Sequence, residues 1–433
     1  MIQTKPKARR GLVAAITPLI VMLSLIGCDS LMEVELPRDI SQESTSDPNL
    51  ANLVTNSVLS TLECAVSSHH AASGLFGTEM QHGSGVASTG LGFRANQPGG
   101  QAFTCIDRDD LGVSNSGSVY VAMAHGRDMT RMVEDALAAG DVYPDADFHL
   151  AYRATYTAYA MTIFGEAHCG AVLEPIGTLL TRTQVLNAAE TWFTKGLQAA
   201  QAAGEATAEN LALLGRARVR LNLGNLSGAA ADAGAIPQGF VFNVTRSATP
   251  QTRNNIVWKF TWKTKSWTID PMWHNLMVQG VPDVRVQVQD MATTTIDGFL
   301  PLFNPTKYAT NDIEERMASW EEAQLIIAEA QLGQIAVDRI NAVRQTHEGL
   351  PLFTPVDVND DDEILNQVIE DRAREFFLEG RVLADMVRFR GTGKTVNLIE
   401  FQEGFEPRGI YIYEANYCMT VPNREIDNNP NTN

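Results

Sequence analysis

The chain has 433 residues, of which 44% are hydrophobic and 19% are charged, a composition that is ordinary for a folded protein and excludes wholesale disorder. Its 33 basic and 51 acidic residues give a formal net charge of −18. Because a phosphate backbone needs a positive field, this acidic excess excludes a protein whose main function is to bind nucleic acid.

The N-terminus has the organisation of an export signal. Four basic residues within positions 5–10 precede an apolar run over residues 12–26, which is short for a membrane-spanning helix. The run ends at Leu25-Ile26-Gly27-Cys28, which resembles the bacterial lipobox, the motif whose cysteine is lipidated and becomes the new N-terminus. We therefore expect residues 1–27 to be a signal peptide, Cys28 to carry lipid, and residues 28–47 to form a polar tether. Removal of the signal changes the formal charge to −22, because the signal contains four basic residues and no acidic one.

Export to an oxidising compartment makes disulfides the expected state of the remaining cysteines. These are four, an even number that indicates two bonds: Cys64, Cys105, Cys169 and Cys418. Four cysteines allow three pairings, and buried free thiols are the alternative. Proximity along the chain favours Cys64–Cys105, which leaves Cys169–Cys418 to join the first half of the protein to its C-terminus. The spacings have none of the C-x-x-C character of a zinc site.

Helices with one glycine-rich interruption are predicted for the first half of the domain. Apolar residues recur at helical spacing over residues 48–66. Residues 73–118 contain ten glycines and are expected to form a long, loop-rich insert. Helices are expected over 118–139 and 146–164, and the second has a narrow stripe of small residues that would let a neighbouring helix approach closely.

Two similar helix hairpins are predicted in the second half, one starting near Leu213 and the other near Leu325. Each has a helix that ends at a glycine, a tight turn and a return helix, as in degenerate tetratricopeptide repeats. Residues 236–312, between the hairpins, are expected to be an irregular insert with some strand. The final helices are expected over residues 313–331, 335–346 and 361–389. The predicted fold is mainly α, with tetratricopeptide-like helix pairs, long irregular inserts and minor β, in one domain over residues 48–433.

Catalytic templates fit this sequence poorly. Glu375 and Glu379 are four residues apart and could form a glycosidase pair. Their neighbours Glu370–Arg374 and Arg381–Asp385 have the same spacing, which favours a ladder of intrahelical ion pairs. We therefore predict that the protein is not an enzyme.

Phosphate and metal sites are equally weak. Gly391-Thr392-Gly393-Lys394-Thr395 lacks the first glycine of a phosphate-binding loop, because Arg388 occupies that position. His69, His70 and His82 could ligate a metal, but their Gly/Ser-rich surroundings favour a mobile loop. We predict no metal and no cofactor.

The segment 256–273 is the strongest candidate for ligand binding. It contains four of the six tryptophans in the chain and three of the six lysines that remain after the signal. Indole faces stack on sugar rings, and lysine binds hydroxyl or anionic groups. Period-two alternation over residues 258–263 favours a half-buried strand, with its aromatic side chains in the core. The ligand candidates are therefore those outside that alternation, together with one residue of the glycine-rich insert: Trp267, Trp273, Lys265 and Phe93.

Four motifs in the last third of the chain resemble, in the same order, those of the SusD/RagB family of outer-membrane nutrient-binding lipoproteins. They are Trp320-Glu321-Glu322-Ala323 with Ala328-Glu329-Ala330; Ile340-Asn341-Ala342-Val343-Arg344 with Gly349-Leu350-Pro351; Glu370 to Arg388 through Glu379-Gly380-Arg381; and Val421-Pro422-Asn423-Arg424-Glu425-Ile426 with Asn429-Pro430. Departures include Asp283-Val284-Arg285 in place of the common D-P-R, and a shortage of aromatic residues. No ligand-contact residue of the family can be carried over.

The resemblance implies a mostly helical surface lipoprotein that captures oligosaccharides or other nutrients and performs no chemistry. Its expected partners are a SusC-like TonB-dependent transporter and a small nutrient such as a glycan, and its expected location is the cell surface, lipid-anchored to the outer membrane. The alternative is a structural or adhesive lipoprotein on the same scaffold. An exposed Trp267 or Trp273 lining a concave pocket would favour nutrient binding, and burial of both would favour the alternative.

Overall fold

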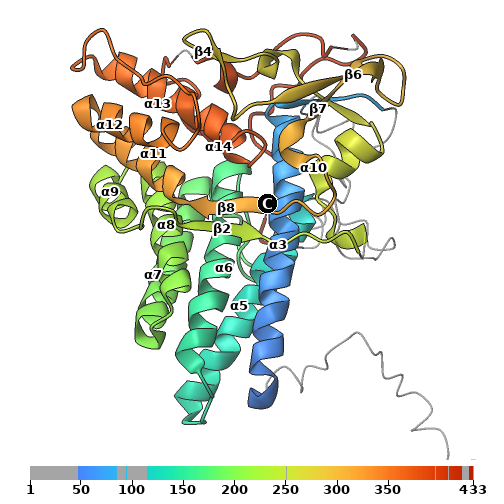
Figure 1. The fold of residues 1–433 in the computed structure, drawn as a ribbon. Helices are drawn as coiled ribbons and strands as arrows, with labels where there is room; N and C mark the ends of the chain where they lie inside the picture. Colours follow the sequence, from blue (N-terminus) through green and yellow to red (C-terminus); the bar gives the residue numbers. More distant parts are fainter. Residues whose placement is uncertain are drawn as a thin grey trace, which may run out of the picture. The chain divides into compact units, whose positions relative to one another are not determined.

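The computed structural model describes residues 47–84, 94, 115–249, 251–394, 396–407, 409–421 and 429–432 (Figure 1). The described residues from Pro48 onward belong to one compact unit. The predicted signal, the lipidation site Cys28 and nearly all of the tether lie outside the described residues, as do Phe93 and Cys105. Within those described, no helix is both long and apolar enough to cross a membrane.

The unit is mainly α, as the sequence predicts. Its longer helices are α3 (Ala51–Phe76), α5 (Asn115–Ala139), α6 (Ala146–Ala167), α7 (Arg182–Ala203), α8 (Ala206–Asn222), α9 (Leu226–Gly234), α11 (Trp320–Gln331), α12 (Gly333–Arg344), α13 (Asp361–Glu375) and α14 (Arg381–Phe389). Short helical turns are η1 (Pro48–Leu50), η2 (Gln251–Arg253), α10 (Ile256–Trp258), η3 (Lys259–Lys263), η4 (Pro271–Trp273), η5 (Thr306–Tyr308) and η6 (Asn397–Ile399).

Helix α6 is the centre of the helical layer and packs against α3, α5, α7 and α8 (Figure 1). From Ala151 to Ala167 every residue of α6 except Tyr152 is buried. The helix is therefore covered on all sides, and its contact surface is wider than the predicted narrow stripe of small residues. Glycines permit the close crossings: a Cβ at Gly196 would lie 2.3 Å from Thr155 Oγ1, and one at Gly215 would lie 2.2 Å from the Phe193 ring.

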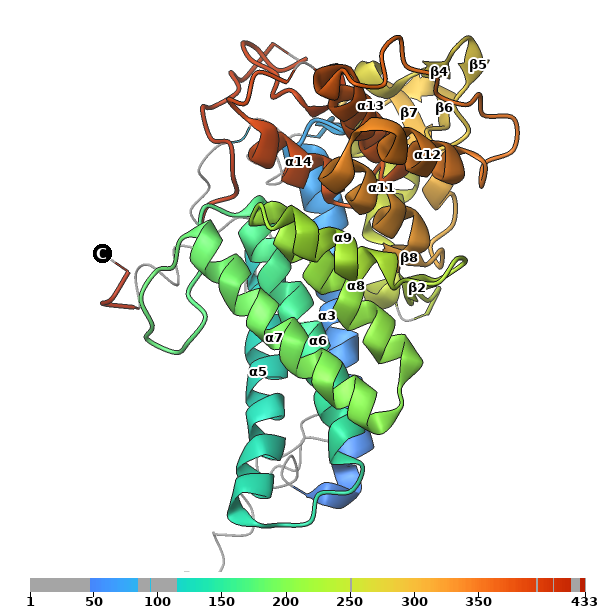
Figure 2. The same ribbon diagram turned by 90° about the vertical axis from the view of Figure 1, so that its left-hand side faces the viewer.

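The two predicted hairpins are present as α8–α9 and α11–α12. Helix α11 packs on both α9 and α8, so the helix pairs form one continuous stack although a long insert separates them in sequence (Figure 2). Strand β2 (Val241–Val244) pairs antiparallel with β8 (Glu315–Ser319) and closes the base of that insert. The tetratricopeptide-like arrangement predicted from the sequence is therefore confirmed.

The remaining strands form three small antiparallel pairs. They are β1 (Met80–His82) with β3 (Trp267–Ile269), β4 (Met277–Val278) with β5 (Val281–Pro282), and β6 (Val288–Thr294) with β7 (Pro301–Pro305). The β1–β3 pair joins the two predicted inserts, with Met80 opposite Ile269 and His82 opposite Trp267.

The first long helix ends ten residues later than predicted. Helix α3 continues to Phe76, and all its residues from Leu62 onward are buried. Its last turns contain serine, histidine and glycine, which have modest helix propensity, but tertiary packing on every side offsets this. His69 and His70 are consequently in the core of the protein and not in the mobile loop that we predicted.

The predicted last long helix, residues 361–389, is two helices. The chain breaks at residues 376–380, where Leu378 has φ +60° and Gly380 has φ +76°. A Cβ at Gly380 would lie 2.8 Å from the His69 ring, so only glycine fits both the backbone angle and the contact with α3.

The strand predicted over residues 258–263 is wrong. These residues belong to α10 and to the π-helical turn η3, in which Thr264 N–H donates to the Lys259 carbonyl at 3.0 Å. Asn255 caps the turn by accepting from Trp258 N–H, and Val257 and Thr261, four residues apart, face the core. A short helix with one buried side produces the same aromatic–lysine alternation as a strand.

Candidate ligand-binding site

Trp267 and Trp273 are core residues. Both are 0% exposed; Trp267 stacks on Phe260 with ring centroids 4.2 Å apart, and Trp273 lies 4.9 Å from Phe377. The Trp273 indole N–H donates to the Thr78 carbonyl. Their positions contradict the predicted ligand contact, because a sugar cannot reach either indole face from solvent.

Lys265 lies at the surface, unlike the two buried tryptophans. Its backbone has φ +53°, and its carbonyl accepts a hydrogen bond from Ile296 N–H in the loop between β6 and β7. The four predicted residues therefore do not form one accessible site among the described residues: Trp267 and Trp273 are buried, Lys265 is exposed, and Phe93 is not described.

A better candidate is a cavity of about 480 Å³ near the C-terminus, which we call the C-terminal groove. It lies between the end of α14, the turn that follows it, η6 and the segments around residues 401 and 417. Its walls combine aromatic, cationic and acidic side chains: Met386, Phe389, Arg390, Gly391, Lys394, Ile399, Glu400, Phe401, Glu403 and Tyr417.

The aromatic wall of the groove is held by guanidinium groups. Phe401 and Tyr417 meet edge to face, with centroids 5.2 Å apart. The buried Arg94 guanidinium lies 5.1 Å from the Phe401 ring, 5.0 Å from Tyr413 and 5.6 Å from Tyr417. On the exposed side, Arg390 lies 3.5 Å from the Tyr417 ring centroid. Cation–π contacts of this kind hold the rings in one orientation, and both rings remain partly exposed at the cavity.

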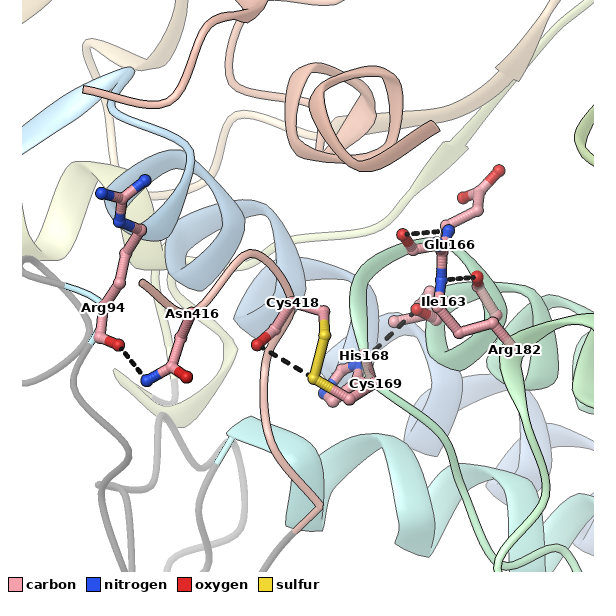
Figure 3. The surroundings of a disulfide bond; sticks show 9 residues. Arg94, Ile163, Glu166, His168, Cys169, Arg182, Asn416 and Cys418 are labelled. Carbon is pink, nitrogen blue, oxygen red and sulfur yellow. Dashed lines mark hydrogen bonds between the residues drawn. A yellow bond between two sulfur atoms is a disulfide. The ribbon is translucent and has the colours of Figure 1, made fainter. Parts of the chain in front are cut away.

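A disulfide fixes the backbone beside Tyr417 (Figure 3). Cys169, just after α6, is bonded to Cys418 with a Cα–Cα distance of 5.2 Å. Cys169 N–H donates to the Met419 carbonyl at 2.9 Å, and Met419 N–H donates to the Ala167 carbonyl at 2.8 Å. On the other side, the Asn416 amide donates to the Arg94 carbonyl at 2.8 Å. Both neighbours of Tyr417 are thus anchored to distant segments.

This bond is one of the two that chain proximity suggests. Cys64 is also disulfide-bonded. Its proposed partner Cys105 lies outside the described residues, so the Cys64–Cys105 pairing stays a prediction.

A hydrogen-bond chain connects the groove to both inserts. The Gln402 amide donates to Asp270 Oδ2 at 3.1 Å, and Gln81 donates to the same oxygen at 2.6 Å. The Tyr413 hydroxyl donates to Gln402 Oε1 at 3.0 Å. Burial raises the pKa of Tyr413, so its phenol stays neutral and keeps donating.

Glu375 and Glu379 are not a catalytic pair. Both are buried, and Arg316 lies 2.9 Å from Glu375 and 3.0 Å from Glu379; His347 and Lys307 contact them too. Burial alone would raise the pKa of each carboxyl, but the cations, Arg316 foremost, hold it below its usual value. A glycosidase acid needs a raised pKa, so the electrostatics favour the structural role that we predicted.

The motif residues form a buried ion-pair network. Arg218 and Arg381 contact Glu322, Arg285 and Arg344 contact Asp371, and Arg372 and Arg388 contact Asp385. The predicted intrahelical pair Glu370–Arg374 is present at 2.5 Å. In place of the predicted pair Arg381–Asp385, Arg381 contacts Glu322 on α11, and Asp385 contacts Arg372 on α13 and Arg388 on its own helix.

Histidine does not form a metal site in the part of the chain that the structure describes, where no group of three metal-ligating side chains occurs. His70 Nδ1 lies 2.9 Å from Glu315 Oε2, and burial lowers the pKa of His69, so His69 is neutral.

The C-terminal groove was not predicted from the sequence, although the sequence contains one signal for it: three of the nine tyrosines lie within residues 411–417.

No protein-family model matches the sequence, and no curated protein matches it. Solved structures do. A SusD/RagB family protein from Bacteroides thetaiotaomicron has 11% identity and a TM-score of 0.64, over 88% of this chain and 94% of that one. Surface glycan-binding protein A from Bacteroides uniformis has 11% identity and a TM-score of 0.63, over 87% of this chain and 98% of that one. A laminarin-binding SusD-like protein has 15% identity and a TM-score of 0.59, over 87% and 97%. At such identities, the similarity establishes the fold alone.

Proposed function

We propose that this chain, which has the fold of the SusD/RagB proteins, is a lipid-anchored nutrient-binding protein of the outer-membrane surface that delivers a glycan to a SusC-like TonB-dependent transporter. The sequence supports export and lipidation through the lipobox that ends at Cys28. The fold supports a binding role, because solved proteins that share it are named as carbohydrate- or glycan-binding.

The observation that carries the proposal is the C-terminal groove. Phe389, Phe401 and Tyr417 line it beside charged side chains, and the cavity is large enough for a short oligosaccharide. Sugars bind to such surfaces by stacking their apolar faces and by hydrogen bonding their hydroxyls.

Calorimetric titration against neutral and acidic oligosaccharides and peptides tests the proposal. We expect at least one glycan to bind, and Tyr417→Ala to weaken it at least tenfold, which corresponds to about 1.4 kcal/mol. Phe299→Ala is the matched control, since Phe299 is an aromatic residue that is 65% exposed on a different loop. The affinity of this variant for the glycan should differ less than twofold from that of the wild type. Failure of every glycan and peptide to bind, together with no co-purifying transporter, would overturn the proposal.

The second candidate is a structural or adhesive surface lipoprotein without ligand transport. Burial of both Trp267 and Trp273 favours it, because the aromatic-rich segment 256–273 then serves the core. The titration above separates the two, since a purely structural protein binds no glycan in the groove.

A further inference from the structure

We propose that the C-terminal groove selects an acidic sugar, a ring that carries a carboxylate such as a uronate. This inference rests on the proposed function and names its substrate class.

Arg390 and Arg94 differ from the other arginines around them. Within the last third of the chain, buried arginines are matched with carboxylates, as in Arg344–Asp371 at 2.7 Å and Arg372–Asp385 at 2.9 Å. Among the described residues, neither Arg390 nor Arg94 has a carboxylate within ion-pair distance. Arg390 lines the groove and Arg94 contacts its wall residues Phe401 and Tyr417, so two guanidiniums without a carboxylate partner meet at one aromatic cluster.

Arg390 is the group that can reach the ligand. It is exposed, lines the groove, and has its guanidinium carbon over the Tyr417 ring, 3.5 Å from the centroid. A guanidinium presents a planar fork of N–H donors that matches a carboxylate in two parallel hydrogen bonds. A sugar ring stacked on the neighbouring aromatic wall would bring its carboxylate to this fork.

Arg94 supplies positive charge from behind the wall. It is 1% exposed, its Nη2 donates to the Gln402 carbonyl at 2.5 Å, and its Nε and Nη1 have no hydrogen-bond partner in the described ranges. The charge of Glu403 acts on it without forming an ion pair. A buried cation that lacks a close carboxylate is costly, and an anion across the rings of Phe401 and Tyr417 would reduce that cost.

The remaining charges of the groove fit a sugar acid better than a simple anion. Lys394 is paired with Asp362, which partly neutralises its charge. Glu400 and Glu403 are exposed at the cavity and would repel a compact polyanion, but their oxygens can accept hydrogen bonds from sugar hydroxyls. One carboxylate with several hydroxyls satisfies both kinds of side chain.

Matched ligand pairs test the inference. Oligosaccharides of galacturonate, glucuronate and mannuronate are titrated beside their methyl esters, which keep the ring and lose the charge. We expect at least one acid to bind at least tenfold more tightly than its ester, with an affinity that falls as salt rises. Arg390→Gln should lower the affinity for the acid at least tenfold and the affinity for the ester less than twofold. Lys195→Gln, which removes a cation from above the Trp192 ring on α7, should change neither.

The outcomes separate this inference from the proposed function. Binding of a neutral glycan that Tyr417→Ala weakens, with no acid preferred over its ester, would overturn the acidic selectivity and leave the proposed function standing. Absence of binding by any glycan, acidic or neutral, would overturn both.

Discussion

Glu79 is a buried carboxyl that the fold keeps protonated near neutral pH. Its Oε1 accepts from Leu378 N–H at 2.6 Å, while its Oε2 has no hydrogen-bond partner in the described part of the chain. Burial raises its pKa from 4.5 to about 8. The native state therefore holds a proton that the unfolded chain releases above pH 4.5, and the free energy of unfolding falls as pH rises from there to about 8.

Glu79→Gln should remove that pH dependence, because the amide keeps the acceptor for Leu378 and cannot ionise. Urea unfolding at pH 5 and pH 8 measures this dependence. We expect the difference in free energy of unfolding, variant minus wild type, to be about 3 kcal/mol larger at pH 8 than at pH 5. An equal effect at both pH values would show that Glu79 does not titrate in this range.

Glu322 is the centre of the ion pairs that join α8, α11 and α14. It accepts from Arg218 Nε at 2.6 Å and from Arg381 Nε at 3.3 Å, and although burial alone would raise its pKa, these cations lower it to about 2. Glu322→Gln removes the negative charge that two buried guanidiniums share, so we expect the free energy of unfolding to fall by about 3–5 kcal/mol. Glu370→Gln is the control, because the Glu370 carboxylate is 39% exposed in its pair with Arg374 and should cost less than about 1 kcal/mol. Equal losses in the two variants would contradict a central role for Glu322.

At the scale of elements, the Cys169–Cys418 bond ties the end of α6 to the segment that contains Tyr417. The bond closes a span of 249 residues and so restricts the unfolded chain. Replacement of both cysteines by serine should lower the free energy of unfolding by about 2–5 kcal/mol, which thermal unfolding measures. We also expect weaker glycan binding in calorimetry, because Tyr417 loses one of its two anchored neighbours. Unchanged affinity would mean that the hydrogen bonds of Cys169 and Met419 suffice to position it.

The pairing of β1 with β3 is a further device at this scale. It joins the two inserts and, through Gln81 and Asp270, connects them to Gln402 beside the groove. The inserts thus support the groove through their core contacts, although their tryptophans do not line it.

At the scale of the whole molecule, the proposed anchor decides where the protein works. Cys28→Ala removes the thiol that the lipobox predicts to be acylated. We expect the variant to lose radiolabelled palmitate and to move from the membrane fraction to the soluble fraction on cell fractionation, since a lipid chain supplies the membrane affinity. Retention in the membrane without label would contradict the lipid anchor and leave the groove unaffected.

The helical scaffold could be predicted from the sequence because its signals are local. Apolar periodicity predicted α5 and α6 closely, and the glycines after Leu223 and Leu332 predicted the turns of both hairpins. Boundaries failed where tertiary contacts decided them, at the long end of α3 and at the break before Gly380. The alternation over residues 258–263 failed because a short half-buried helix and a strand produce the same pattern.

By itself, the sequence determined the mainly helical fold, its helix pairs and the motif residues of the ion-pair network, since spacing along a helix expresses these features directly. Only the tertiary structure decided which aromatic residues are available to a ligand. Trp267 and Trp273 are buried by elements far away in sequence, while Arg94, Arg390, Phe401 and Tyr417 meet at one place through long-range packing and a disulfide. Composition indicates where aromatic residues are concentrated, but exposure depends on what folds over them, and that information is not local.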